Sequence, residues 1–214
     1  MKARAAMLWS PEDTAWSIED VEIDEPKGAE LLVRNVASGL CHSDEHFITG
    51  DMPHGGYPWI AGHEGAGIVE AVGPDVRGFA PGDHVVFSFV AVCGQCPSCA
   101  DGHSNLCDNG SMVMGGRMLD GTSRIHVKGQ DALIMAGLGT FATHSVVHEW
   151  SAVKVLPDLP LDKVVLLGCG ATTGWGSSVY AAEVKPGDTV HDGVNFQFLR
   201  RRNIASRGEP PERM

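Results

Sequence analysis

Four of the six cysteines in this chain of 214 residues fall in one short stretch, and their spacing indicates a metal site. They follow a C-x2-C-x2-C-x7-C pattern and are Cys93, Cys96, Cys99 and Cys107. Thiolates carried on such short turns can converge on one tetrahedral Zn²⁺, and four of them fill its coordination shell. A filled shell leaves no position for water or substrate. The spacing therefore predicts a structural zinc site in a four-cysteine lobe, residues 92–110.

Two disulfide bonds are the alternative use of these four cysteines, and they need an oxidising compartment. The N-terminal residues turn polar and acidic too early for a secretory signal, and the longest apolar run, near residues 85–92, is too short to span a bilayer. We therefore expect a cytoplasmic protein whose cysteines bind zinc. The formal net charge of −11 argues against nucleic acid and against an anionic membrane surface as partners.

The two remaining cysteines and one histidine form a second candidate site. Cys41 lies in the segment GLCHSDEH, His63 in GHEG and Cys169 in LLGCGATTGWG. Two cysteines and one histidine with an open fourth position make a catalytic zinc shell, in which the metal acidifies a bound water or alcohol. A lone cysteine is more often a small buried apolar residue, and a lone histidine a structural one. Spacing alone leaves both interpretations open.

Short strands are the main elements available to position these residues. Apolar runs separated by Gly and Pro turns predict an all-β barrel or sandwich in the first half of the chain. The predicted strands are Ala5–Trp9, Trp16–Ile23, Glu30–Ala37, Gly67–Val72 and His84–Val92. After residue 158 the pattern changes, and Ala171–Glu183 has the length and the alanines of a helix that ends before Pro186 and Gly187.

Together these segments resemble the zinc-dependent medium-chain alcohol dehydrogenases. The resemblance rests on GLCHSDEH at 39–46, GHEGAG at 62–67, the four-cysteine lobe and GCG at 168–170, and it runs from about residue 3 to residue 190. It implies a mostly β, GroES-like catalytic domain with short helices, which we place at residues 1–185. The chain looks most similar to the liver-type and formaldehyde-oxidising branch, and to actinobacterial-type alcohol dehydrogenases that hold their nicotinamide tightly.

The resemblance assigns roles to the residues that match the family's motifs. Cys41, His63 and Cys169 match the ligands of the catalytic zinc. Ser43 matches the hydroxyl that takes the proton from the bound alcohol, and His46 matches the histidine that passes this proton towards solvent. An imidazole suits that work because its ordinary pKa is near neutral.

Three more residues near these ligands have counterparts in the family. Asp44 resembles the carboxylate that orients the ring of the ligating histidine. Glu64 resembles the acidic neighbour that approaches the metal during ligand exchange, and His42 takes the place of a cationic residue near the cofactor pyrophosphate. Ser43 also has a structural alternative as the N-cap of a short helix over residues 44–48, and the two roles are compatible.

An enzyme of this family also needs a dinucleotide-binding domain, which is marked by a glycine-rich turn between a strand and a helix. We reject the partial matches at Gly137–Ala142 and Gly168–Gly170, because the resemblance makes the first a β segment and the second the zinc loop. Residues 191–214 carry no glycine fingerprint and include three adjacent arginines at 200–202. We expect that the Rossmann domain is absent through truncation or a frame change, and that 186–214 is an aberrant, disordered tail.

The resemblance implies oxidation of a primary alcohol to an aldehyde by hydride transfer to NAD(P), with about two zinc ions per chain. Hydride transfer needs the nicotinamide carbon within about 3–3.5 Å of the alcohol carbon, so we expect this chain to be inactive by itself. The alternative function is a non-enzymatic zinc-binding remnant or interaction module. The implied partner is a small alcohol or aldehyde. Homo-oligomers are usual in the family but are in doubt here, because relatives pair through the nucleotide domain.

Overall fold

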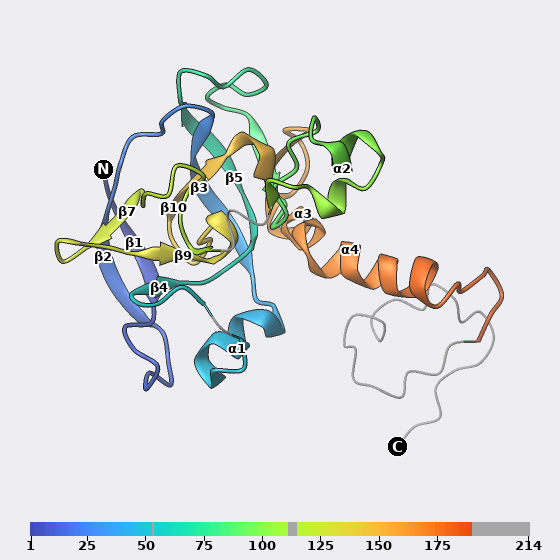
Figure 1. Cartoon of the computed structure of the whole chain (residues 1–214), viewed down its shortest axis with the longest axis horizontal. Coiled ribbons are helices and arrows are strands. Elements are labelled where there is room, and N and C mark those ends of the chain that lie inside the picture. Colours follow the sequence, from blue (N-terminus) through green and yellow to red (C-terminus); the bar gives the residue numbers. More distant parts are fainter. Residues whose placement is uncertain (53, 111–114, 190–214) are drawn as a thin grey trace. The chain divides into compact units, whose positions relative to one another are not determined.

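The computed structural model describes residues 1–52, 54–110 and 115–189 (Figure 1). The chain divides into two compact units, Met1–Gly168 and Cys169–Met214. The described part is mostly β with a few short helices, which confirms the predicted fold class. The domain boundary predicted at residue 185 stays a prediction. The predicted disordered tail lies, from residue 190 onwards, outside the described residues.

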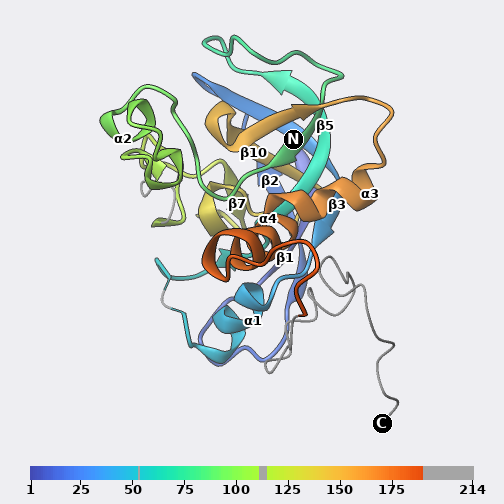
Figure 2. The ribbon, with the colours of Figure 1, turned by 90° about the vertical axis from the view of Figure 1, so that its right-hand side faces the viewer.

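A five-stranded antiparallel sheet forms the centre of the first unit, in the order β10-β3-β5-β6-β11. Its strands are β3 (Glu30–Gly39), β5 (Glu64–Val72), β6 (His84–Phe87), β10 (His144–His148) and β11 (Ala152–Val155). The long pairing of β3 with β5, visible in Figure 2, places Gly39 opposite Glu64. Because Cys41 follows β3 and His63 precedes β5, this register brings the two predicted ligands to the same end of the sheet.

A second sheet, in the order β1-β2-β7-β8, completes the first unit together with a short parallel pair. Its strands are β1 (Lys2–Met7), β2 (Ser17–Ile23), β7 (Ile125–Val127) and β8 (Gln130–Asp131), and the pair is β4 (Trp59–Ile60) with β9 (Leu133–Ile134). Alternate residues of β1 are buried, as expected for a strand with one face on the core. Its buried side chains pack with those of β2 and β7 in one apolar cluster.

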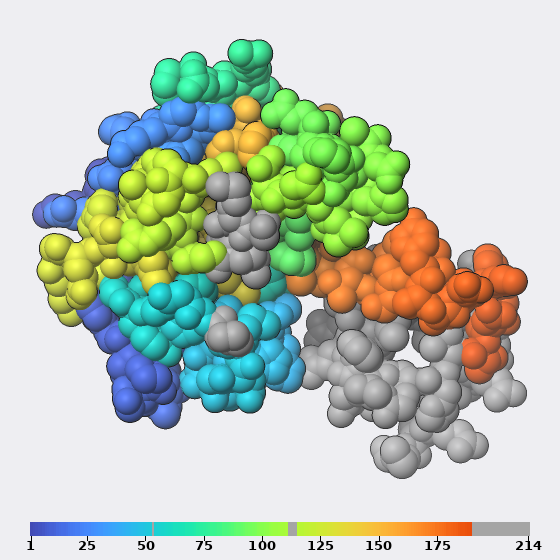
Figure 3. Space-filling model, in the orientation of Figure 1, coloured from blue at the N-terminus to red at the C-terminus, as the bar shows by residue number. Residues whose placement is uncertain are grey.

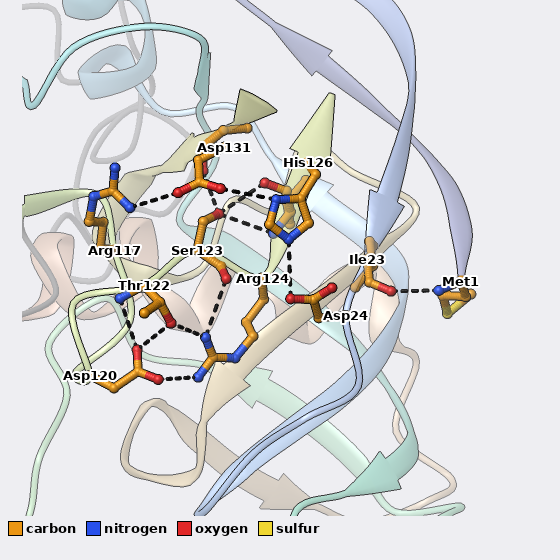
Figure 4. A network of polar contacts seen from close by, with 12 residues as sticks. Met1, Ile23, Asp24, Arg117, Asp120, Thr122, Ser123, Arg124, His126 and Asp131 are labelled. Carbon is orange, nitrogen blue, oxygen red and sulfur yellow. Dashed lines mark hydrogen bonds and ion pairs between the residues drawn. The ribbon is translucent and has the colours of Figure 1, made fainter. Parts of the chain in front are cut away.

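A buried ion pair connects the two sheets. Arg124, directly before β7, has a side chain that is 1% exposed and donates two hydrogen bonds to Glu30, the first residue of β3 (Nε–Oε2 2.8 Å, Nη2–Oε1 2.7 Å). Figure 4 shows the same guanidinium with Asp120, 2.6 Å away. Partial desolvation raises the pKa of Asp120, but the hydrogen bonds from Arg124 and Thr122 outweigh it and hold that pKa below its usual range.

The helices of the first unit are short. They are α1 (His42–Thr49), α2 (Pro97–Ala100) and α3 (Leu161–Val164), with 3₁₀ turns η1 (Ser104–Leu106), η3 (Met135–Gly137), η4 (Glu149–Ser151) and η5 (Val165–Gly168). Helix α1 ends at Thr49 and is followed by Gly50 as its C-cap, whose φ of 78° is in the left-handed region that glycine adopts readily. In the second unit, α4 (Gly170–Trp175) continues into a π-helical segment, η6 (Gly176–Ala181), where the sequence predicts a helix over 171–183.

The predicted strand His84–Val92 is too long, because β6 ends at Phe87. From there the Ser88 N–H donates to Ser151 O (2.8 Å), and the Ser88 hydroxyl donates to Val90 O (3.0 Å). These bonds turn the chain out of the sheet towards the four-cysteine lobe. In Figure 3 the green segment that contains this lobe forms a separate bulge on the surface of the first unit.

Candidate metal centres

The four predicted cysteines of the lobe converge in the structure. The Sγ atoms of Cys93, Cys96, Cys99 and Cys107 all lie within 4.8 Å of one another. Cys96 and Cys107 are buried, and the other two are half-buried. None of the six cysteines forms a disulfide bond in the structure. The geometry is that of a four-thiolate metal site.

Backbone N–H groups of the lobe point at the sulfur atoms. Cys96 is the N-cap of α2, and its Sγ accepts the N–H of Cys99 (3.5 Å) and of Asp108 (3.4 Å). The Cys96 N–H donates to Cys93 Sγ (3.3 Å), and the Cys93 N–H donates to Cys107 Sγ (3.4 Å). Hydrogen bonds of this kind stabilise thiolates more than thiols. The local backbone is therefore built for ionised cysteines.

The thiols of the lobe also oppose one another's ionisation. The pKa of Cys93 is lowered to about 6, and the largest cause is the hydrogen bond from the backbone N–H of Gln95. Desolvation, followed by the neighbouring Cys96 sulfur, raises the pKa of Cys99 to about 12. Like charges at this separation cannot all form unless a cation balances them, and a coordinated thiol is deprotonated outright. The donor set thus fits a soft divalent cation such as Zn²⁺.

A second group of metal-ligating atoms lies at the end of the β3–β5 pair, and we call Cys41, His63 and Glu64 the buried cluster. Their ligand atoms lie within 4.8 Å of one another. His63 and Glu64 are each 3% exposed, and Cys41 is half-buried. Burying a histidine and a carboxylate beside a thiol is costly unless a cation or strong hydrogen bonds compensate for it. This donor set also fits Zn²⁺.

Asp44 connects the three segments that meet at the buried cluster. It is 1% exposed, and its carboxylate accepts the N–H of Cys41 (2.9 Å) and of Gly62 (3.0 Å). Its Oδ1 lies 3.5 Å from Nδ1 of His63. One carboxylate therefore fixes the start of α1 against the loop before β5 and faces the imidazole ring; the role predicted for Asp44 stays a prediction.

Ser43, His42 and His46 all lie on α1 beside the buried cluster. The helix begins at His42 with Cys41 as its N-cap, so the alternative of Ser43 as an N-cap is wrong. The Ser43 hydroxyl instead lies 3.6 Å from Cys41 Sγ. The side chains of His42 and His46 are 76% and 38% exposed, respectively. The structure thus places one hydroxyl at the cluster and two imidazoles towards solvent.

Sequence reasoning missed two residues that shape the buried cluster. A Cβ atom at Gly39 would lie 2.0 Å from Oε2 of Glu64, so the absence of a side chain there leaves room for the carboxylate. Phe89 packs edge-on against His63, with ring centroids 5.8 Å apart and planes at 80°. The signal for Gly39 was its place in the GLCHSDEH segment, although its contact depends on strand register. Phe89 had no sequence signal.

Cys169 is the first residue of the second unit. Its Sγ lies 3.8 Å from Oγ1 of Thr173, and its carbonyl oxygen accepts a hydrogen bond from the Thr172 hydroxyl (2.8 Å). Gly168, the last residue of the first unit, lies against β6 and β5, since a Cβ atom there would be 2.6 Å from Phe87 O and 3.8 Å from the Cα of Glu64. The first unit therefore ends beside the buried cluster.

No helix among the described residues is long and apolar enough to cross a membrane. Residues 27–158 match the family described as the alcohol dehydrogenase GroES-like domain. Alcohol dehydrogenase B of Mycobacterium tuberculosis (strain H37Rv) is 48% identical over 191 residues, which cover 89% of this chain and 51% of that protein. The NDMA-dependent alcohol dehydrogenase of Amycolatopsis methanolica is 48% identical over 190 residues, which cover 88% of this chain and 50% of that protein.

A crystal structure of an alcohol dehydrogenase zinc-binding domain protein from Burkholderia ambifaria superposes with a TM-score of 0.80 at 37% identity, covering 88% of this chain and 51% of the other. The chain spans about half the length of the relatives it matches. The match to the family covers more than half of the 214 residues, and the predicted family is confirmed. This chain belongs to the alcohol dehydrogenase GroES-like domain family.

Proposed function

We propose that this chain is the zinc-binding catalytic half of an alcohol dehydrogenase. In this proposal the complete enzyme oxidises a primary alcohol to an aldehyde and passes a hydride to NAD(P). The observation that carries it is the buried cluster, where Cys41, His63 and Glu64 meet at the end of the β3–β5 pair with Asp44 behind them. The names of the relatives support the same activity.

The proposed ligands of the catalytic zinc are Cys41, His63 and Cys169, with Glu64 as the acidic neighbour. Cys169 is included because it matches the third ligand in the family's motif. The four cysteines of the lobe are the proposed ligands of a structural zinc. About two zinc ions per chain follow from this assignment.

When bound, the catalytic zinc supplies a Lewis acid that lowers the pKa of the alcohol hydroxyl. Ser43 would relay the hydroxyl proton, accepting it while it donates its own hydroxyl proton onwards, because its Oγ lies beside Cys41 Sγ (3.6 Å) at the cluster. His46, one turn further along α1 and partly exposed, carries the proton to solvent. Asp44 holds the His63 ring in place. His42, at the exposed start of α1, is the proposed contact of the cofactor pyrophosphate.

The proposed partners are a small alcohol or aldehyde and NAD(P), and the proposed location is the cytoplasm, where cysteines stay reduced. The formal net charge of −11 disfavours nucleic acid. A zinc-binding module without activity is the second candidate. The self-contained hydrogen bonding of the four-cysteine lobe favours it, because the lobe needs neither the buried cluster nor a cofactor.

Metal analysis separates the two candidates. We expect elemental analysis of the purified 214-residue protein, after dialysis, to give about two zinc ions per chain. In protein reconstituted with Co²⁺, trifluoroethanol should change the visible spectrum, because an alcohol enters the open position of the catalytic shell and the four-cysteine site has none. The matched variant His63→Ala should bind about one metal ion and show no spectral change.

One zinc ion per chain in the wild-type protein, or two ions with no response to alcohol, would support the module instead. We expect negligible cofactor reduction by the 214-residue protein alone. A rate that saturates with alcohol concentration would contradict that expectation.

A further inference from the structure

Helix α1 carries two histidines one turn apart on its exposed face. Their rings are stacked, with centroids 4.8 Å apart and planes within 12° of parallel. Residues four positions apart lie one above the other on a helix, so both imidazoles reach the same patch of solvent. The side chains of His42 and His46 are 76% and 38% exposed, whereas the side chain of His63, in the buried cluster, is 4% exposed.

Each of these imidazoles has one ring nitrogen near a carboxylate. Nε2 of His42 lies 3.4 Å from Oε2 of Glu45, and Nδ1 of His46 lies 3.5 Å from Oδ2 of Asp51. Histidines that ligate metals commonly hold a carboxylate on the second nitrogen, which fixes the ring and makes the first nitrogen a better donor. The acidic side chains also give this patch a negative charge when the imidazoles are neutral.

We propose that His42 and His46 chelate a transition-metal ion at this face of α1, once side-chain rotation takes the two rings out of their parallel stack and points one nitrogen of each at a common position. Two imidazoles select ions such as Zn²⁺, Ni²⁺ or Cu²⁺, whereas carboxylates alone would suit Mg²⁺ or Ca²⁺. Glu45 and Asp51 stay on the second ring nitrogens of the two histidines, and water completes the shell. Because this site is exposed and has no thiolate ligand, it exchanges its metal more readily than the four-cysteine lobe or the buried cluster would.

The site goes beyond the proposed function and also bears on it. A metal ion on His46 occupies the imidazole that the proposed proton path uses, so an excess of such ions inhibits the complete enzyme. Binding itself requires no cofactor and no turnover. Its test is therefore independent of whether the chain is a dehydrogenase.

Retention of the untagged, zinc-loaded protein on immobilised Ni²⁺ tests the proposal, because a resin-bound ion cannot enter the four-cysteine lobe or the buried cluster. We expect retention that ends when imidazole is added. His42→Gln and His46→Gln should each weaken binding to the resin about tenfold or more, since each removes one arm of a chelate. Copper should retain the protein more strongly than nickel. Variants are compared at equal zinc content, which shows that α1 and its surroundings are still folded.

Two control variants distinguish metal binding by the His42–His46 pair from binding by any single exposed histidine. His103→Gln removes a histidine that is 62% exposed and should leave retention unchanged. His42→Gln combined with Glu45→His keeps the count of 10 histidines but puts two at adjacent positions, which do not face each other, and it should bind the resin no better than His42→Gln alone. Full retention of His42→Gln and His46→Gln, or its loss in His103→Gln, would overturn the proposal.

Discussion

The four-cysteine lobe and the buried cluster both gather metal-ligating atoms within 4.8 Å of one another, but they do so by opposite means. The lobe takes its ligands from one short segment, whose own N–H groups bind the sulfurs. The buried cluster takes its ligands from the start of α1 and the start of β5, which only the β3–β5 register brings together. A local site is therefore independent of the sheet, whereas a non-local site depends on it.

The largest expected effect is loss of the metal from the lobe. Cys96→Ser removes a buried ligand that also caps α2 and accepts two N–H groups. Because structural zinc contributes on the order of 10–16 kcal/mol of apparent binding free energy, we expect zinc content to fall by about one ion per chain and the lobe to become sensitive to protease.

The matched variant is His63→Ala, which should also cost about one zinc ion but leave the lobe resistant to protease. Elemental analysis and mapping of the cleavage sites measure both effects. If Cys96→Ser released both metals, the two sites would not be independent.

The second prediction weakens the sheets without touching either group of ligands. Arg124→Ala leaves Glu30 buried without its charged partner, and breaking a buried pair in this way costs about 3–5 kcal/mol of unfolding free energy. We expect denaturant unfolding to show this loss, and a chelator to remove zinc from the buried cluster sooner than in the wild-type protein. Removal from the lobe should be unchanged.

Arg117→Ala serves as the control for Arg124→Ala. Its ion pair with Asp131 has side chains that are 41% and 45% exposed, so its loss should cost about 1 kcal/mol or less. Equal acceleration of zinc release from the lobe and from the buried cluster in Arg124→Ala would mean that the lobe also depends on the sheets.

The same difference decides what the sequence could predict. The lobe was predictable because its cysteines are close in sequence, and their spacing alone specifies a tetrahedral set. The mostly β fold followed from strand and turn patterns, although β6 stops at Phe87 where a longer strand was expected. At the buried cluster, the residue types alone make Cys41 and His63 candidate ligands, but only the resemblance to a family favours that interpretation and adds Glu64. The space that Gly39 leaves for Glu64 depends on a β3–β5 pairing that shifts register twice, and no local pattern encodes it.

The N-cap of α1 is another point at which the structure differs from the sequence-based expectation. A serine near a helix start is a good N-cap, so Ser43 was a reasonable candidate. The structure begins the helix two residues earlier, at His42 instead of residue 44, and the Asp44 carboxylate accepts the N–H of Cys41. The choice depends on Gly62, which donates to the same carboxylate from a distant part of the chain and is invisible to local sequence patterns.

Asp44→Asn gives the smallest and most specific expected effect. The amide keeps the shape of the carboxylate, but its NH₂ group must face a backbone N–H, of Cys41 or of Gly62, that a carboxylate oxygen now accepts. Loss of such a supporting carboxylate typically lowers metal affinity about 10–100-fold, or about 1.4–2.7 kcal/mol. We expect a chelator competition assay to show this decrease for the zinc of the buried cluster and no change for the lobe. Asp51→Asn, at an exposed carboxylate just after α1, should leave both affinities unchanged. An equal decrease at both sites in Asp44→Asn would mean that Asp44 stabilises the whole unit and does not act mainly through His63.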